Sequence, residues 1–221
     1  YRVEVDADAD FSSVDKFSET RDLSTHVTGL APNTTYYGRM KAINHANTGT
    51  SWVPVWAASA TYAAVPSLAL GDFILYSDSG TVTWNPNGNP AGTRYKVWFA
   101  TEATFGIAPR SIEVTQTTAG DVNVSQELIG LVSNQPYYVR VDVLGHNGAT
   151  FSSPVLNKNT SAGLVPAVVL SPSGDKTREL TLQWDNRKNS PETRYVVELS
   201  TDSNFNEAVT TQETTPANAN Q

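Results

Sequence analysis

The sequence predicts an all-β chain built as a tandem array of two-sheet sandwiches. Short segments alternate between apolar and polar residues from end to end, as strands with one buried face do, and no stretch has the period of an amphipathic helix. One pattern also returns three times: a tyrosine opens an alternating segment, and a phenylalanine follows ten positions later. The three pairs are Tyr1 and Phe11, Tyr95 and Phe105, and Tyr195 and Phe205.

The repeats have the length of a small domain. The three tyrosines lie 94 and 100 residues apart. Other landmarks recur at an offset of 100, namely Trp84 with Trp184, Pro66 with Pro166, and Thr93-Arg94-Tyr95 with Thr193-Arg194-Tyr195. A period of about 100 residues is too long for the turns of a solenoid and long enough for a separate core, so we expect independent beads.

The middle bead is the one complete copy that the pattern predicts. We expect its strands at 67–76, 81–84, 94–100, 111–115, 123–128, 137–144 and 151–159, separated by turn-forming Asn, Gly and Pro. Seven short antiparallel strands in about 100 residues indicate a sandwich. By phase, residues 1–62 form a partial repeat with strands C to G, residues 63–163 the complete repeat, and residues 164–221 a partial repeat with strands A to C′.

A recurring arrangement of aromatic residues marks the strands of each bead. A tryptophan ends the second strand, Trp84 or Trp184, and a tyrosine such as Tyr95 opens the third. The run Leu30-x-Pro32-x-Thr34-x-Tyr36 precedes the sixth strand and returns as Leu131-x-Ser133-x-Gln135-x-Tyr137. These features resemble the fibronectin type III domain, and the Asn- and Gly-rich turns are similar to tandem copies in bacterial secreted or surface proteins.

The resemblance implies roles for seven residues. Tyr36 and Tyr137 would each form a tyrosine corner, a hydroxyl that bonds to the backbone a few residues upstream. Ser133 and Gln135 replace the Pro and Thr of the family's motif in the second copy. The resemblance places the following residues in the structural core: Trp84, Trp184, Tyr36, Tyr137, Tyr95, Leu30 and Leu131.

Composition excludes several function classes. The chain has no cysteine, which removes disulfides, thiolate nucleophiles and cysteine-ligated metals. A net charge of −7 argues against binding to a phosphate backbone, so we expect no nucleic-acid partner. No run of 18 apolar residues is present, so we predict no membrane span in this segment. We expect neither a cofactor nor a catalytic site, because the histidines His26, His45 and His146 stand in no catalytic or metal-binding spacing.

Three local patterns allow a ligand and also a plainer explanation. Asp6, Asp8 and Asp10 place carboxylates on one face of an extended segment, which suits either calcium or an edge-protecting charge run. Trp52 and Trp56 would share a face of an ideal strand, as a sugar-binding platform or as core packing. The glycosylation pattern Asn-x-Ser/Thr occurs at 33–35, 123–125 and 159–161, and it is short enough to arise by chance.

The function predicted from these patterns is structural. We expect a non-enzymatic, extracellular or cell-surface array that belongs to a fibre, a sheath or a large secreted protein, with Val65-Pro66 and Val165-Pro166 limiting motion at its joints. Its expected partners are neighbouring repeats, including head-to-tail self-assembly by strand addition, and a surface polysaccharide or protein. Two alternatives stay open: a spacer or carbohydrate-binding accessory module of a secreted polysaccharide-degrading enzyme, and a protein-binding adhesin.

Overall fold

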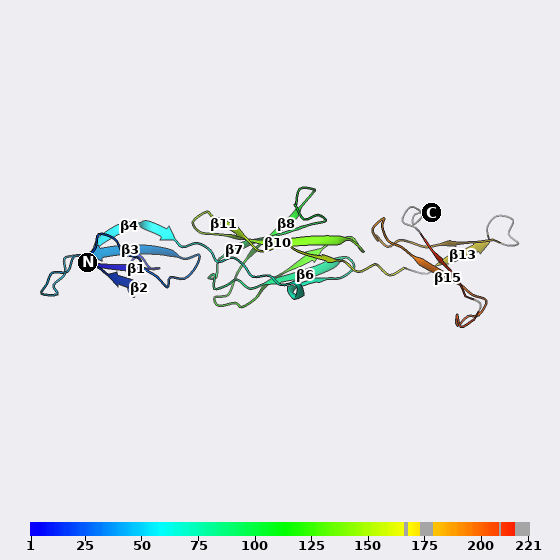
Figure 1. Ribbon diagram of the computed structural model, residues 1–221, viewed down its shortest axis with the longest axis horizontal. Helices are drawn as coiled ribbons and strands as arrows, with labels where there is room; N and C mark the ends of the chain where they lie inside the picture. The colour runs from blue at the N-terminus through cyan, green and yellow to red at the C-terminus, as the bar shows by residue number, and fades with distance from the viewer. Residues whose placement is uncertain (166–167, 173–178, 208, 215–221) are drawn as a thin grey trace.

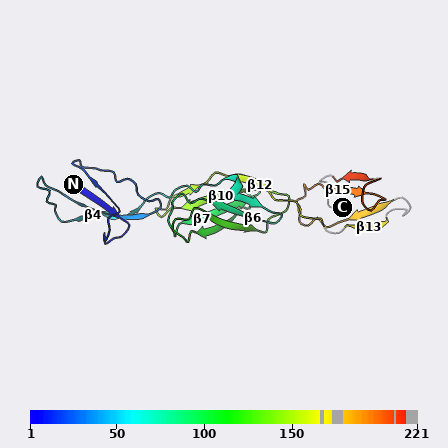
Figure 2. The same ribbon diagram turned by 90° about the horizontal axis from the view of Figure 1, so that it is seen from below.

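The computed structural model describes residues 1–165, 168–172, 179–207 and 209–214; the side chains of 55–57 and 172 are not described. Strands follow one another in three parts that lie in a row along the longest axis in both views (Figures 1 and 2). Within the described residues the sole helix is the three-residue 3₁₀ turn η1 (Leu70–Asp72). The all-β class predicted from the period-two pattern is therefore confirmed.

The middle part is a sandwich of two antiparallel sheets. One sheet has the order β5 (Phe73–Leu75), β6 (Ser79–Trp84) and β9 (Val124–Ile129). The other has the order β11 (Thr150–Ser152), β10 (Pro136–Leu144), β7 (Arg94–Ala100) and β8 (Arg110–Thr115), with β12 (Leu156–Asn159) also paired to β10. Counting β11 and β12 as one interrupted strand, this is the seven-stranded immunoglobulin-like arrangement, with strands A, B and E facing C′, C, F and G.

The core of the sandwich lies between these two sheets. Alternate residues of β7 and β10 point inward, and Val97, Val139 and Val141 have no exposed surface. Trp84 and Tyr95 are equally buried, and their rings meet edge to face with centroids 5.3 Å apart. The remaining fully buried large side chains of this cluster come from both sheets: Phe73, Val82, Phe99, Leu128 and Val143.

The N-terminal part repeats the larger sheet of the sandwich. Its strands β1 (Arg2–Asp6), β2 (Lys16–Glu19), β3 (Thr35–Lys41) and β4 (Val53–Ala60) have the order β2-β1-β3-β4, as C′, C, F and G have in the middle part. The registers coincide as well. Arg2 lies opposite Glu19 in β2, and Lys96, which holds the corresponding place in β7, lies opposite Glu113.

The C-terminal part contains two hairpins. One pairs β13 (Val169–Pro172) with β14 (Leu180–Gln183), and the other pairs β15 (Val196–Leu199) with β16 (Thr210–Glu213). Val196 lies opposite Glu213, so the register of the C–C′ hairpin is the same in all three parts. Trp184 and Tyr195 pack with centroids 5.5 Å apart, in the manner of Trp84 and Tyr95. Periodicity in the sequence thus corresponds to periodicity in the strand pairing.

Two predicted strands are interrupted. The strand expected over 67–76 is wrong at its centre, because η1 occupies 70–72 and only 73–75 pairs with β6. The carboxylate of Asp72 accepts a hydrogen bond from the Ala69 backbone, which closes this turn. The strand expected over 151–159 divides into β11 and β12 around Pro154, since proline has no N–H to donate to a ladder.

Candidate functional site

Each of the two described tyrosine corners ties one turn to the end of a sheet. The hydroxyl of Tyr36 accepts a hydrogen bond from the Ala31 backbone at 3.0 Å, and the hydroxyl of Tyr137 accepts one from Val132 at 3.0 Å. Leu131 is buried in the middle core, and Leu30 lines the apolar face of the N-terminal sheet. The turn in front of strand F is consequently held in the same shape in both parts.

Replacing the corner tyrosine tests this contact directly. We expect Tyr137→Phe to destabilise the middle sandwich by about 1 kcal/mol, because the Val132 N–H loses its acceptor while the ring stays packed. Hydrogen exchange of the β10 amides, which lie within the middle sandwich, measures the change. Tyr138→Phe is the matched control, since the Tyr138 hydroxyl has no hydrogen-bond partner within the described residues. Equal stability of the two variants would contradict the corner's contribution.

The turn that each tyrosine corner fixes places an asparagine at the end of the sheet. Asn33 and Asn134 both adopt left-handed backbone angles, with φ of 47° and 52°. Asparagine tolerates this conformation better than most residues. The N–H of Asn33 donates to the carbonyl of Tyr62, and that of Asn134 donates to the carbonyl of Ser161. These bonds join the turn to the segment that leads into the next part. The asparagine side chain therefore faces the next part of the chain.

The Asn33 side chain connects the N-terminal sheet to the middle sandwich. Its Nδ2 donates to the hydroxyl of Thr93 at 2.9 Å, and its Oδ1 accepts from the backbone of His146 at 2.7 Å. Asn33 and Thr93 have no exposed surface. The glycosylation pattern at 33–35 therefore does not mark an accessible acceptor in this structure, because its amide is buried between the two parts.

Asn134 makes the corresponding connection to the C-terminal part. Its Nδ2 donates to the hydroxyl of Thr193 at 2.9 Å. Ser190 adds two bonds, from its N–H to the carbonyl of Ser133 at 2.9 Å and from its hydroxyl to the carbonyl of Asn134 at 2.8 Å. Pro90 holds the equivalent position at the first joint and has no N–H to donate. The Asn–Thr contact is shared by both joints, whereas the serine contacts are specific to the second.

A second asparagine fixes the connecting chain at each joint. The side chain of Asn89 accepts a bond from the Ala64 N–H and donates to the Ala64 carbonyl, both at 2.8 Å. Asn189 does the same for Gly163, at 2.6 and 3.2 Å. The side-chain amide acts like a peptide group of a neighbouring strand, and it holds one residue of the linker by both of its polar backbone groups.

The contacts of Asn89 continue into the middle core. Its Nδ2 also lies 3.3 Å from the hydroxyl of Tyr95, which donates to Oε1 of Gln116 at 3.2 Å. Gln116 in turn donates to the carbonyls of Asn89 and Thr118. Burial raises the pKa of Tyr95, and the bond from Asn89 opposes the shift. Asn189 donates likewise to the hydroxyl of Tyr195 at 3.2 Å, so the third-strand tyrosine links joint and core in both cases.

The dipeptides predicted to stiffen the joints lie beside these asparagines. The carbonyl of Val65 accepts a bond from Asn87 at 2.7 Å, which adds a contact at the first joint. In the second joint, Pro166 lies outside the described residues, and Arg187 takes the place of Asn87. The sequence predicts that proline stiffens the joints, whereas the described contacts there come from side-chain amides.

The phenylalanines of the threefold pattern occupy one turn position. Phe11, Phe105 and Phe205 share a φ of 54° at the turn between strands C and C′. In the middle hairpin, Glu102 accepts bonds from the Thr104 hydroxyl and from the backbone of Thr104, Gly106 and Ile107. The hydroxyl bond, followed by the backbone bonds, lowers the pKa of Glu102 to about 2.

The hydrogen bonds to Glu102 predict a low pKa for its carboxyl group, which NMR can measure. We expect the carboxyl signal of Glu102 to titrate near pH 2, below the ordinary glutamate value of about 4.3. Because the folded-state pKa is depressed, the turn's contribution to stability is present above the unfolded-state value and is lost as the pH falls toward 2. Thr104→Ala should move the midpoint upward. A wild-type midpoint at the ordinary value would contradict the described bonds.

The outer face of the N-terminal sheet is covered by its own charged residues. Arg39 donates to Glu4 at 2.7 and 2.9 Å, and its guanidinium stacks on Phe11 and Trp52 at 4.2 and 4.4 Å from the ring centroids. Burial alone would raise the pKa of Glu4, but bonds from Arg39 and Arg2 hold it below its usual value. Lys41 also lies over the Trp52 ring, at 4.5 Å.

These contacts bear on the predicted sugar platform. Trp52 precedes β4, and the pairing of β3 with β4 has register shifts on both sides of Gly38, so the two tryptophans do not belong to one ideal strand. Two cations already contact the Trp52 ring. The side chain of Trp56 lies outside the described part of the chain, and the platform stays a prediction.

The predicted calcium ligands do not gather in the structure. One oxygen of Asp6 accepts from the Asp8 backbone and one of Asp10 accepts from Ser12, which are local turn contacts. In the described part of the chain, no group of three His, Cys, Asp or Glu side chains is placed to hold a metal ion. Nor does any helix of that part have the length and apolar character needed to cross a membrane.

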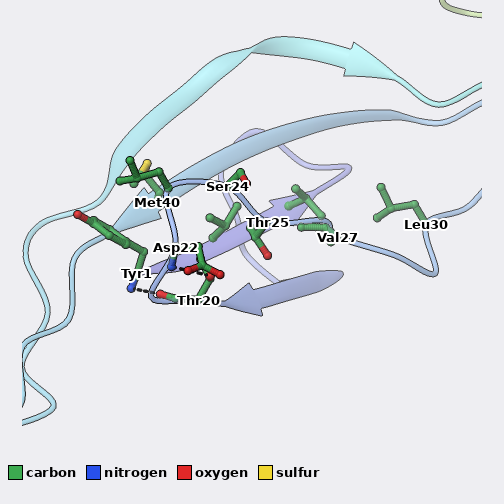
Figure 3. Close-up of a pocket in the computed structure, with 11 residues that line it drawn as sticks. Tyr1, Thr20, Asp22, Ser24, Thr25, Val27, Leu30 and Met40 are labelled. Atoms are coloured by element: carbon green, nitrogen blue, oxygen red, sulfur yellow. Dashed lines mark hydrogen bonds between the residues drawn. The ribbon is translucent and has the colours of Figure 1, made fainter.

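An apolar pocket of about 500 Å³ lies on the inner face of the N-terminal sheet (Figure 3). Val3, Val5 and Met40 come from the sheet, while Leu23 and Val27 come from a segment without strand structure. In the repeat, that segment corresponds in position to β9, which pairs with β6 in the middle sandwich. Without a strand to pair with, residues 23–28 form no ladder, and Leu23 is 98% exposed.

Comparisons with known proteins leave the family unassigned. No protein-family model and no curated protein matches the chain. A solved structure described as a myokine is 18% identical over 45% of this chain and 98% of its own, with a TM-score of 0.36. The FN1–FN3 domains of chicken CNTN1 are 18% identical, with coverage of 72% and 55% and a TM-score of 0.37. The chicken interferon gamma receptor alpha chain is 12% identical, with coverage of 57% and 66% and a TM-score of 0.35. At these scores the fold rests on the strand order above.

Proposed function

We propose that this chain is a stretch of an extracellular, non-enzymatic array of fibronectin type III-like units, and that its role is structural or adhesive. The units are those predicted from the sequence, 1–62, 63–163 and 164–221. The observation that carries the proposal is the repetition of the joint: Asn33 and Thr93 at the first are matched by Asn134 and Thr193 at the second. A chain whose parts are connected by the same asparagine–threonine contact is suited to a fibre, a sheath or a long surface protein.

The partners proposed for each unit are its neighbours in the chain. A polysaccharide or protein bound by an adhesive array would meet the outer sheet faces and the edges. The loops before strand C and between strands F and G are the usual ligand-binding loops of such sandwiches. Here Thr93 and His146, one from each loop, contact Asn33 instead. The bacterial type of array is proposed from the sequence resemblance alone.

Head-to-tail self-assembly is proposed for the uncovered face of the N-terminal sheet. β13 and β14 correspond in order to β5 and β6, and their residues Val169, Leu170 and Leu180 are about half exposed. A second copy could place this hairpin over the pocket beside Val5. Sedimentation of the 221-residue chain at several concentrations tests the idea. Reversible association that Leu170→Asp abolishes is expected, and a monomer at every concentration would contradict it.

Electron microscopy of the native assembly tests the proposed function. We expect immunogold labelling on the surface of intact source cells, on a filament or layer with a regular repeat of beads. Protease treatment of intact cells should remove the label. Labelling only after cell lysis would contradict the extracellular array. Labelled beads dispersed around a catalytic domain would instead support the accessory-module alternative.

A further inference from the structure

We infer that the joint is a stereospecific recognition surface, which allows a unit to accept one kind of successor in one orientation. The partner that it fits is another unit of this chain's type, with a threonine two residues before the tyrosine of strand C and an asparagine four residues before that threonine. The inference deepens the proposed function and depends on it only for its extension to longer arrays. Its contacts all lie within the present chain.

Two complementary surfaces meet at each joint. The surface at the end of one unit consists of the turn held by the tyrosine corner, with its left-handed asparagine, and the departing linker. The opposing surface consists of the loop before strand C, which supplies Thr93 and Asn89 at the first joint and Thr193 and Asn189 at the second. The asparagine–threonine bond and the asparagine–linker bonds join the same atoms in both joints, so these contacts are a property of the repeat.

Burial makes these contacts selective for orientation. Asn33 and Thr93 are fully buried, and Asn89 and Thr193 are 2% and 3% exposed. Turning one unit about the linker would break these hydrogen bonds and expose the surface that the joint buries, including the half-buried Asn134 at the second joint. Breaking hydrogen bonds between such groups costs free energy. Without them, two units joined by a linker are expected to change their relative orientation. The orientation with every amide paired is therefore selected over its neighbours.

The contacts of Asn33 can form only when the following unit is folded. Thr93 lies before strand C and His146 follows strand F, so they are 53 residues apart in the sequence. Both reach the same amide, at 2.9 and 2.7 Å. Tyr62 of the linker also packs edge to face on Phe151, with centroids 5.6 Å apart. Only a sandwich with strands C, F and G assembled can present all of these groups together.

Distance measurements between spin labels test the inference at the first joint. Because the chain has no cysteine, labels can be attached uniquely at Lys16→Cys in β2 and Ser111→Cys in β8, two exposed strand positions. In the full 221-residue chain we expect a single narrow distance peak. Asn33→Gly keeps the backbone freedom that the turn needs but removes the amide, so we expect it to replace the peak by a broad distribution.

Two further variants keep the result interpretable. Thr93→Val preserves the volume of the side chain and removes its hydroxyl, and it should broaden the distribution as well. Asn47→Gly is the matched control, because Asn47 also has a left-handed φ, of 61°, but is exposed and lies in a turn away from the joint. Hydrogen exchange of β3 and β10 shows whether each variant remains folded.

The outcomes separate the inference from its rivals. A broad distribution in the wild-type chain would overturn it, and so would a peak that stays narrow in both folded joint variants, since the linker alone would then fix the orientation. A narrow wild-type peak that only the joint variants lose would support it. These results leave the cell-surface labelling experiment untouched, so the joint and the proposed function can fail independently.

Discussion

Replacing Trp84 by alanine is expected to remove a large share of the stability of the middle sandwich. The indole has no exposed surface, lies between the two sheets and packs against Tyr95. Truncation of a buried tryptophan costs about 3–5 kcal/mol, because apolar contacts are lost and a cavity remains. Small domains are stable by only about 5–15 kcal/mol, so this single change removes a major part of the margin.

Hydrogen exchange measured by mass spectrometry is the appropriate readout for Trp84→Ala. The chain has several parts and is not expected to unfold in one step, so a single melting temperature would mix their contributions. Peptides covering β7 and β10 should lose their protection, while those of β1 and β3 should change less. Unchanged protection of β10 would show that Trp84 is not a core residue.

Trp84→Phe separates packing from hydrogen bonding. Nε1 of Trp84 is buried and has no hydrogen-bond partner in the described part of the chain. Phenylalanine keeps most of the apolar contacts and removes this unpaired donor, so we expect a much smaller loss than with alanine. An equal loss in the two variants would contradict the main contribution of apolar ring packing at this position.

Much of the fold could be predicted because each strand carries its own pattern. Alternation along 94–100 and 137–144 follows directly from one buried and one exposed face, and the positions of Trp84 and Tyr95 repeat at 184 and 195. The prediction failed where the backbone conformation is decided by a specific contact or by a missing neighbouring strand. Residues 67–76 alternate acceptably, yet the closing contact of Asp72 bends them into η1. The segment 23–28 has the composition of a strand and lacks a strand to pair with.

The joint was harder to predict than the fold, although its signals were present in the sequence. Thr93 and Thr193 repeat at an offset of 100, but the repetition alone does not indicate what the threonine contacts. Asn33 matched a glycosylation pattern, which describes three neighbouring residues and contains no information on burial. Its partners Thr93 and His146 are 60 and 113 residues away. Only the tertiary arrangement brings these groups together, since side-chain amides have no periodic signature.

Replacing Asn89 by alanine is expected to weaken the joint and the middle core together. The variant leaves the N–H and carbonyl of Ala64 without their partner and removes one bond from the Tyr95 hydroxyl, which still donates to Gln116. Each unpaired buried group costs about 1–3 kcal/mol, but Ala64 is only partly buried, so we expect a total loss of about 2–4 kcal/mol. Hydrogen exchange of β7 and β10 measures the loss in the middle core, and exchange of the Ala64 amide measures the loss at the joint.

Two control variants show whether the loss of stability in Asn89→Ala comes from the hydrogen bonds of the amide or from the volume of the side chain. Asn123→Ala changes an exposed asparagine with no described side-chain bond and should leave stability nearly unchanged. Asn89→Asp preserves the shape and an acceptor for the Ala64 N–H, but an ionised carboxylate has no donor for the Ala64 carbonyl or for Tyr95, and its burial is itself unfavourable. We therefore expect Asn89→Asp at neutral pH to be at least as unstable as Asn89→Ala. Wild-type stability in Asn89→Asp would mean that the donated bonds contribute nothing, and the linker would then be held by packing and by the bond from the Ala64 N–H.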